Sequence, residues 1–119
     1  MIIYVDSSLR EACYVLSGQE PTIIPYPELV TVNVGEYRAV LLALEEARRL
    51  ELKQVMLLTD SLLVVNQVNG KWRCKKAHLL PYRDKVRKLL KDCPCKLLPS
   101  PIKYLPAASN IWSEVSQFP

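Results

Sequence analysis

Four carboxylates in this chain stand where predicted strands end or predicted helices begin. Asp6 follows the run MIIYV, Glu36 lies in TVNVGEYRAV, Asp60 lies in VMLLTDS, and Glu114 lies in SNIWSE. They are far apart in the sequence, so only a fold that gathers strand ends could bring them together. Divalent metal is the usual reason for a protein to gather like charges. The quartet is therefore a candidate for a two-metal site that cleaves phosphodiesters.

The hydrophobic pattern predicts the elements that would position these carboxylates. Residues 2–5 predict a buried strand because the run is apolar and continuous, and residues 11–17 alternate and predict its hairpin partner. A third strand is expected at residues 28–32, since three prolines in residues 21–27 argue against a long regular element there. The first third of the chain should form a small antiparallel sheet.

The middle of the chain changes to a helical period. Residues 34–52 carry apolar side chains at three- and four-residue spacing and predict an amphipathic helix. Glu36 is expected in its first turn, where the helix dipole favours a carboxylate. Residues 54–59 predict a second buried strand, and residues 62–70 predict a short helix that stops at an Asn-Gly pair.

The last part of the sequence predicts a basic helix, an edge strand and a short terminal helix. Residues 79–91 form the helix, with a proline tolerated in its first turn, and residues 96–105 form a strand that two prolines restrict to a sheet edge or a bulge. Asn110 offers an N-cap for the helix that carries Glu114. The pattern predicts one α/β domain over residues 1–119, with a mixed sheet.

The charge of this chain is unevenly distributed. Its 119 residues carry a net charge of +4, but residues 1–70 hold five Lys and Arg against nine Asp and Glu, a balance of −4. Residues 71–103 hold eleven Lys and Arg against two Asp, a balance of +9. An acidic part and a basic part in one small domain suggest that the basic part holds a polyanion while the acidic part acts on it. The alternative is a solvated face on a Lys-rich helix.

Composition sets further expectations. No apolar run is long enough to span a membrane, and we expect a soluble, cytoplasmic protein with no membrane partner and no organic cofactor. Four cysteines include Cys93-Pro-Cys95, which is too tight for a zinc site, so reduced structural thiols are expected and a redox role of this turn is the alternative. The only histidine, His78, is interpreted as a structural or surface residue.

With these residues in place, the chain resembles the type 1 ribonuclease H family almost from end to end. IIYVDSS resembles the family's opening strand with Asp-Gly-Ser, and TVNVGEYRAVLLALE resembles Thr-Asn-Asn-x-Ala-Glu-Tyr at the first helix. LLTDSLLVVNQVNGKW is similar to the Asp-Ser strand end and the helix after it. IKYLPAASNIWSE is similar to the last strand, a Pro-Arg-x-x-Asn turn and the closing Asn-x-x-Ala-Asp.

This resemblance implies a ribonuclease H-like fold: a mixed five-stranded sheet of three antiparallel and then two parallel strands, flanked by helices. It implies that Asp6, Glu36 and Asp60 bind two Mg²⁺ or Mn²⁺ ions, with Glu114 in the place of the final Asp. Such ions would activate a water and stabilise the leaving oxygen during hydrolysis of the RNA strand of an RNA/DNA hybrid. Without metal, repulsion among the carboxylates should raise at least one pKa.

The resemblance also implies residues that contact nucleic acid. Asn33 would reach the minor groove of the hybrid, where the 2′-hydroxyl distinguishes RNA from DNA, and Thr31 would hold a phosphate of the DNA strand. Ser8 and Ser61 would lie near the strand that is cut. A short basic loop would bind the backbone of the hybrid, through Lys71, Trp72, Lys75 and Lys76. Trp72 is equally compatible with a place in the core.

The sequence departs from the family pattern at several positions. Ser7 replaces Gly, Val32 replaces the first Asn, Leu62 replaces a polar residue, Ala107 replaces the Arg of the turn, and the His that many members carry before the last helix is absent. Glu114 extends its carboxylate about 1.5 Å further than an Asp would. Three alternatives therefore stay open: a catalytically weakened module that only binds nucleic acid, a DNA nuclease of the integrase type, and carboxylates that are merely solvated.

Overall fold

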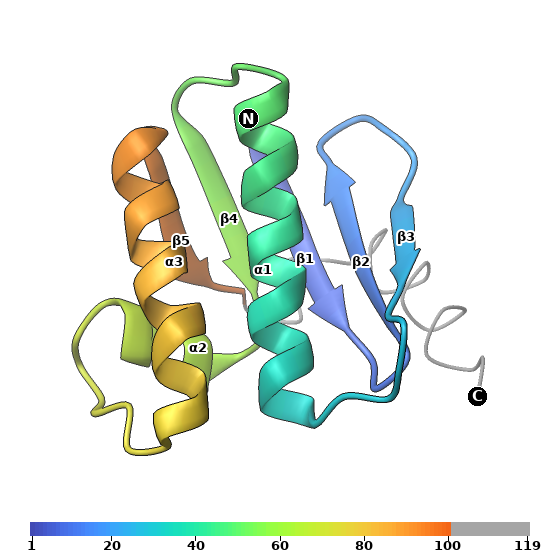
Figure 1. Cartoon of the computed structure of the whole chain (residues 1–119). Helices are drawn as coiled ribbons and strands as arrows, with labels where there is room; N and C mark the ends of the chain where they lie inside the picture. The colour runs from blue at the N-terminus through green and yellow to red at the C-terminus, as the bar shows by residue number, and fades with distance from the viewer. Residues whose placement is uncertain (101–119) are drawn as a thin grey trace.

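The computed structural model describes residues 1–100 as a five-stranded sheet with helices packed against it (Figure 1). The strands are β1 (Ile2–Ser7), β2 (Glu11–Leu16), β3 (Thr22–Pro25), β4 (Val55–Thr59) and β5 (Cys95–Pro99). The helices are α1 (Val32–Arg49), α2 (Leu62–Val68), the short 3₁₀ helix η1 (Ala77–Leu79) and α3 (Leu80–Asp92). The expected terminal helix with Asn110 and Glu114 lies outside these residues.

The sheet has the predicted mixed topology. Its strand order is β3-β2-β1-β4-β5, in which β1 to β3 are antiparallel neighbours and β4 and β5 join in parallel. β5 lies at an edge, where the missing N–H of its proline costs no ladder hydrogen bond. The predicted α/β fold is confirmed, and so is the edge position of the last strand.

The core forms where α1 and α3 lie side by side over one face of the sheet (Figure 1). The predicted inner face of α1 is buried, including Tyr37, Val40 and Leu44, and it packs in one cluster with Ile3 of β1 and Leu57 of β4. These side chains are 1% exposed or less, and burying each aliphatic one stabilises the fold by about 1.5–3 kcal/mol.

The third strand was predicted in the wrong place. Residues 28–32 do not form a strand; β3 lies earlier, at Thr22–Pro25, within the proline-rich stretch. β3 is the other edge of the sheet and has only four residues, so prolines at and beside its ends leave its pairing with β2 intact. Residues 28–31 form a loop instead, in which the Val30 N–H donates to the Leu9 carbonyl at 3.1 Å.

Helix α1 begins two residues earlier than predicted. Thr31 is its N-cap, and its hydroxyl accepts a hydrogen bond from the Val34 N–H at 3.3 Å. Glu36 is thus the fifth residue of the helix, at the start of its second turn, and the first turn holds no acidic residue. The expectation that the dipole of the first turn stabilises Glu36 is therefore wrong, and its carboxylate needs another partner.

The Cys93-Pro-Cys95 turn leads into β5, whose first residue is Cys95. The Cys93 thiol donates to the Leu52 carbonyl at 3.4 Å, and the two sulfurs lie 2.8 Å apart without a bond between them. Burial and the neighbouring thiol raise the pKa of Cys95 to about 12, which disfavours the reactive thiolate.

Within residues 1–100, no helix is long and apolar enough to cross a membrane.

Candidate metal and nucleic-acid site

Asp6, Glu36 and Asp60 come from three elements that meet at one end of the sheet. β1 and β4 are parallel and in register, with Val5 opposite Thr59, so Asp6 and Asp60 each follow one residue later. The N-terminal part of α1 reaches the same end (Figure 1). The fold thus brings three of the four predicted carboxylates to the same end of the sheet, while Glu114 lies outside the described residues.

Burial and neighbouring carboxylates both raise the pKa values of Asp6 and Glu36. The pKa of Asp6 rises to about 6, first because burial penalises its charge and then because Asp60 and Glu36 repel it, against a lowering by the Ser7 N–H. Burial also raises the pKa of Glu36, and the charge of Asp60 adds to this rise. The predicted rise is confirmed, but its main cause is desolvation rather than repulsion.

Ser61 is the side chain that holds Glu36. Its hydroxyl donates to Glu36 Oε2 at 2.5 Å and accepts from the Val64 N–H at 3.3 Å, so it also caps α2. Ser61 is only 5% exposed. Its observed role is to fix a carboxylate and a helix, whereas contact with the cut strand stays a prediction.

A close approach of backbone explains the glycine before Glu36. A Cβ on Gly35 would lie 2.7 Å from Ser7 Oγ and 3.2 Å from the Ser8 carbonyl oxygen. The Tyr26 hydroxyl lies 2.7 Å from Ser7 Oγ and donates to the Gly35 carbonyl at 2.8 Å. This contact seats the start of α1 on the strand that carries Asp6, and so sets how near Glu36 can come.

The donor set fits a hard divalent cation, although the side chains are not gathered as a complete site. Carboxylate oxygens are the ligands that Mg²⁺ and Mn²⁺ prefer. Among residues 1–100, no three Asp, Glu, His or Cys side chains are placed closely enough to hold a metal ion. Protein donors contact two of the carboxylates: Glu36 accepts from the Ser61 hydroxyl, and Asp6 accepts from the Ser7 N–H at 2.8 Å.

Four of the predicted nucleic-acid contacts line one pocket. This pocket has a volume of about 220 Å³ and lies between the start of α1, α2 and the loop that follows α2. The predicted residues in its wall are Asn33, Trp72, Lys75 and Lys76. Trp72 is 50% exposed, so its ring belongs to this surface and not to the core.

The other predicted contacts are placed as follows. Lys71 is exposed in the same loop. Thr31 is exposed at the N-cap of α1. Ser8 accepts hydrogen bonds from the N–H groups of Arg10 and Glu11 at 3.1 Å and shapes the turn between β1 and β2. Their roles toward nucleic acid stay predictions.

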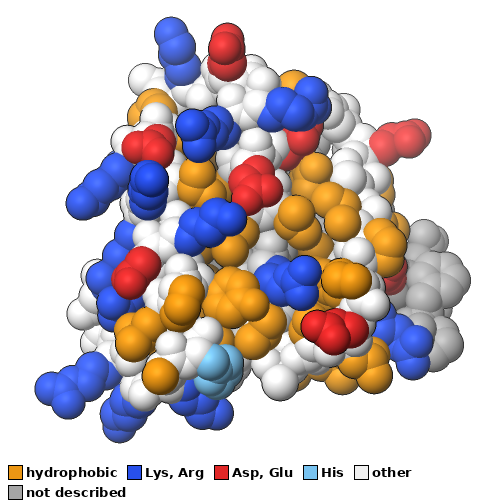
Figure 2. Space-filling view, in the orientation of Figure 1, with side chains coloured by type: hydrophobic (Ala, Val, Ile, Leu, Met, Phe, Trp, Pro, Cys, Tyr) orange, Lys and Arg blue, Asp and Glu red, His pale blue; other side chains and the backbone are white. Residues whose placement is uncertain are grey.

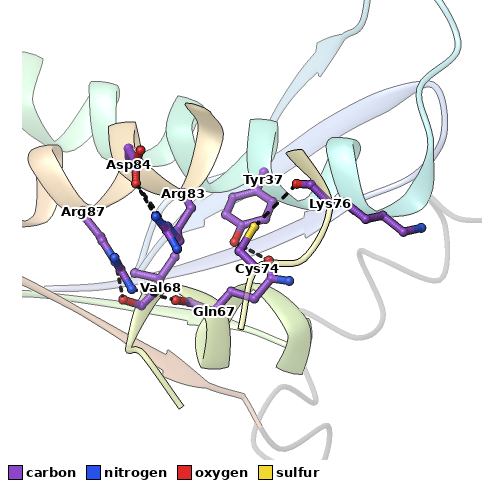
Figure 3. A network of polar contacts seen from close by, with 8 residues as sticks. All are labelled: Tyr37, Gln67, Val68, Cys74, Lys76, Arg83, Asp84 and Arg87. Atoms are coloured by element: carbon purple, nitrogen blue, oxygen red, sulfur yellow. Dashed lines mark hydrogen bonds and ion pairs between the residues drawn. The ribbon is translucent and has the colours of Figure 1, made fainter. Parts of the chain in front are cut away.

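Lys and Arg gather along α3 and around the loop before it (Figure 2). One of them does not point into solvent: Arg87 donates to the Val68 carbonyl at 2.9 Å and the Gln67 carbonyl at 3.0 Å. It satisfies the C-terminal carbonyls of α2 and is structural (Figure 3). His78 is exposed beside this loop.

A buried polar pair beneath this surface was not predicted from the sequence. The Tyr37 hydroxyl donates to Gln67 Oε1 at 2.7 Å (Figure 3). The ring of Tyr37 stacks on that of Tyr82, with 6.2 Å between the ring centroids. The pair joins α1 and α2, and Tyr82 adds α3 to the contact. A signal was present, since Gln67 is a polar residue on the apolar side of a short helix.

A larger hollow lies at the opposite end of the sheet, away from the carboxylates. Its volume is about 560 Å³, and Gln54, Met56, Pro94 and Lys96 are among its lining residues. None of the predicted site residues contributes to it. Size alone therefore does not mark the site in this molecule.

Comparison with known proteins gives a family match. The family described as reverse transcriptase-like matches residues 11–95. The "Bifunctional protein Rv2228c" of Mycobacterium tuberculosis is 42% identical over 50 residues, and "Uncharacterized protein Mb2253c" of Mycobacterium bovis is equally so. These matches cover 42% of this chain and only 14% of each relative.

Solved structures match over most of the chain. The RNase H1 of the halophilic archaeon Halobacterium salinarum NRC-1 aligns with a TM-score of 0.75 at 25% identity, covering 87% of this chain and 86% of that one. The N-terminal RNase H domain of Rv2228c from Mycobacterium tuberculosis aligns with a TM-score of 0.69 at 25% identity, covering 86% and 82%. LC11-RNase H1 in complex with an RNA/DNA hybrid, at 22% identity, shares the fold with a TM-score of 0.72 over 87% and 86%.

Proposed function

Because the chain belongs to the type 1 ribonuclease H family, we propose that it is an endoribonuclease that hydrolyses the RNA strand of RNA/DNA hybrids with divalent metal. The observation that carries the proposal is the meeting of Asp6, Glu36 and Asp60 at one end of the sheet, where burial and then the neighbouring carboxylates raise the pKa values of Asp6 and Glu36. Like charges collected at a cost in free energy indicate a cation as their partner.

Asp6, Glu36 and Asp60 would hold two Mg²⁺ or Mn²⁺ ions, with Glu114 as the proposed fourth ligand. When bound, the ions would activate a water and stabilise the leaving 3′ oxygen. The chain's own contribution is to keep these carboxylates ionised and in place. It does so through the Ser7 N–H on Asp6 and the Ser61 hydroxyl on Glu36.

The hybrid would be held by the surface around the 220 Å³ pocket. Asn33 reaches it from the first turn of α1, three residues before Glu36, so a strand lying in this pocket would pass close to the carboxylates. Trp72 offers a ring for stacking, and Lys75 and Lys76 offer charge to phosphates. One of the matching structures has an RNA/DNA hybrid bound, which supports this class of substrate.

The test is a cleavage assay with purified protein and Mn²⁺ or Mg²⁺. We expect cutting of the labelled RNA strand of a hybrid, and loss of cutting in Asp60→Asn, which removes a ligand charge while keeping the shape of the side chain. Duplex DNA and a branched DNA junction compete in the same assay. A preference for either would favour a DNA nuclease of the integrase type, and binding of the hybrid without any cutting would leave only a binding module.

A further inference from the structure

Three hydrogen bonds hold Ser61, one through its backbone N–H and two through its buried hydroxyl. The Ser61 N–H donates to Thr59 Oγ1 at 3.2 Å, its Oγ accepts from the Val64 N–H at 3.3 Å, and the same Oγ donates to Glu36 Oε2 at 2.5 Å. Because the Val64 N–H occupies the hydroxyl oxygen as an acceptor, the hydroxyl proton is directed toward the carboxylate. The side chain is thus held in place before any ligand binds.

The other end of α2 is tied to the same stretch of α1. Glu36 accepts from Ser61 before the first residue of α2, and its neighbour Tyr37 donates to Gln67 in the last turn. Arg87 of α3 then holds the final carbonyls of α2 (Figure 3). Since α2 has only seven residues, these contacts at both ends fix its position relative to α1.

Fixing α2 also fixes Asp60, which directly precedes Ser61. The charges of Asp60 and Glu36 repel each other, and an apolar neighbour would not offset that repulsion. A hydroxyl donor on Glu36 offsets part of it and keeps the carboxylate from turning away. Because a carboxylate has two oxygens, a hydrogen bond to Oε2 leaves the other oxygen able to coordinate a cation.

We propose that Ser61 is a positioning residue whose hydroxyl holds the Glu36 carboxylate beside Asp60, so that both can bind divalent metal. The inference rests on the proposed function. It differs from a role of Ser61 in contacting the cut strand, because it acts on metal binding without nucleic acid. Partners that orient a metal ligand typically change metal affinity or activity by about 10–100-fold when they are removed.

The test is calorimetric titration of the whole chain with Mn²⁺ in the absence of nucleic acid, followed by hybrid cleavage kinetics. Ser61→Gly removes the hydroxyl but costs only a few tenths of a kcal/mol as an N-cap. We expect its Mn²⁺ affinity to fall by about 10-fold or more. On saturating Mn²⁺, kcat should fall while KM for the hybrid stays near the wild-type value. Ser61→Thr keeps the hydroxyl and should restore both Mn²⁺ affinity and kcat.

Thr31→Gly is the matched control for Mn²⁺ affinity, because it removes the hydroxyl N-cap of α1, which makes no contact with Glu36. Its Mn²⁺ affinity should equal that of wild type. If Ser61→Gly does not fold by circular dichroism, Ser61→Cys takes its place, since the thiol keeps the volume but donates weakly.

The outcomes separate the two proposals. Wild-type Mn²⁺ affinity in the variant that lacks the hydroxyl overturns the role of Ser61, whether or not the chain cuts hybrids. If wild type cuts the hybrid and this variant cuts equally well, only the positioning role falls. If wild type neither binds Mn²⁺ nor cuts any nucleic acid, the proposed function falls and takes this inference with it.

Discussion

The carboxylate end of the sheet and the basic loop at residues 71–76 differ in how strongly the fold constrains them. Asp6 and Glu36 are half-buried, bear raised pKa values and are held by defined donors. The Lys and Arg side chains of the loop are exposed and lie around an open pocket. The difference matches the two tasks proposed for them, since metal ligands need precise placement and a bound backbone needs mainly charge.

The carboxylates therefore lower the stability of the metal-free fold, whereas the exposed charges of the loop hardly change it. The cost follows from desolvating and crowding negative charge, which only a cation or a proton can relieve. Substitutions at the two regions should therefore move stability and function in different combinations. The largest effect is expected at Asp6 and the smallest at the loop.

Asp6→Asn should show the cost of the carboxylate end most clearly. We expect hybrid cleavage to fall by about 100-fold or more, because the ligand charge is lost. The metal-free protein should nevertheless become more stable at pH 7, by up to about 3 kcal/mol, since the buried charge is gone and the Asn oxygen can still accept from the Ser7 N–H. Denaturant unfolding in EDTA measures the second effect. Asp92→Asn, at an exposed position, should change stability by less than about 0.5 kcal/mol.

The pH dependence of this gain identifies its source. The pKa of Asp6 is about 6 in the folded state, against an ordinary value of 3.8 that applies to the unfolded chain, so the folded state binds this proton more tightly. The penalty is full above pH 6, shrinks as the pH falls through about 6, and is gone below about 3.8. The stability difference between Asp6→Asn and wild type should follow that course. A difference that is constant between pH 8 and pH 4 would show that charge burial is not its cause.

The packing that seats α1 on β1 can be tested by a double-mutant cycle. Gly35→Ala should destabilise the protein by about 1–3 kcal/mol, because the new Cβ would lie 2.7 Å from Ser7 Oγ. Ser7→Gly alone loses the contact with the Tyr26 hydroxyl. The double variant should be more stable than the sum of the two single effects predicts, by about 0.5 kcal/mol or more. Strict additivity of the unfolding free energies would mean that Ser7 does not limit this position.

Local pattern predicted the elements that carry the carboxylates, because each depends on a run of neighbouring residues. The apolar run of β1 and the helical period of α1 are such signals, and both are confirmed. β3 was misplaced because prolines were taken to exclude a strand, although an edge strand of four residues tolerates them. The topology came from the family resemblance rather than from any local rule.

The contacts that complete the site depend on the fold as a whole. Ser61 and Glu36 are 25 residues apart, and the sequence around either residue does not indicate that the two form a hydrogen bond. Charge alone likewise could not separate Arg87, which folds back onto α2, from Lys75 and Lys76, which face solvent. Residue type predicts what a side chain can do, and only the packed structure decides which partner it meets.

Substitutions in the basic loop should weaken binding of the hybrid without changing the stability of the protein, unlike substitutions of the carboxylates. Lys75→Gln with Lys76→Gln removes two exposed charges, so we expect hybrid binding to weaken by roughly 10-fold at low salt and its salt dependence to become shallower, by a slope of about 1–2. Stability should change by less than about 0.5 kcal/mol per site. Binding is measured in Ca²⁺ or EDTA over a series of salt concentrations.

Lys53→Gln with Lys96→Gln is the matched control, because it removes the same charge from exposed positions that line hollows away from the carboxylates. Its salt slope should stay near that of wild type. Equal losses in both double variants would mean that the hybrid responds to net charge alone and that the loop has no special place in binding. A loss confined to Lys75 and Lys76 would instead locate the polyanion over the pocket that Asn33 and Trp72 share, because short-range contacts and not the overall field would then carry the difference.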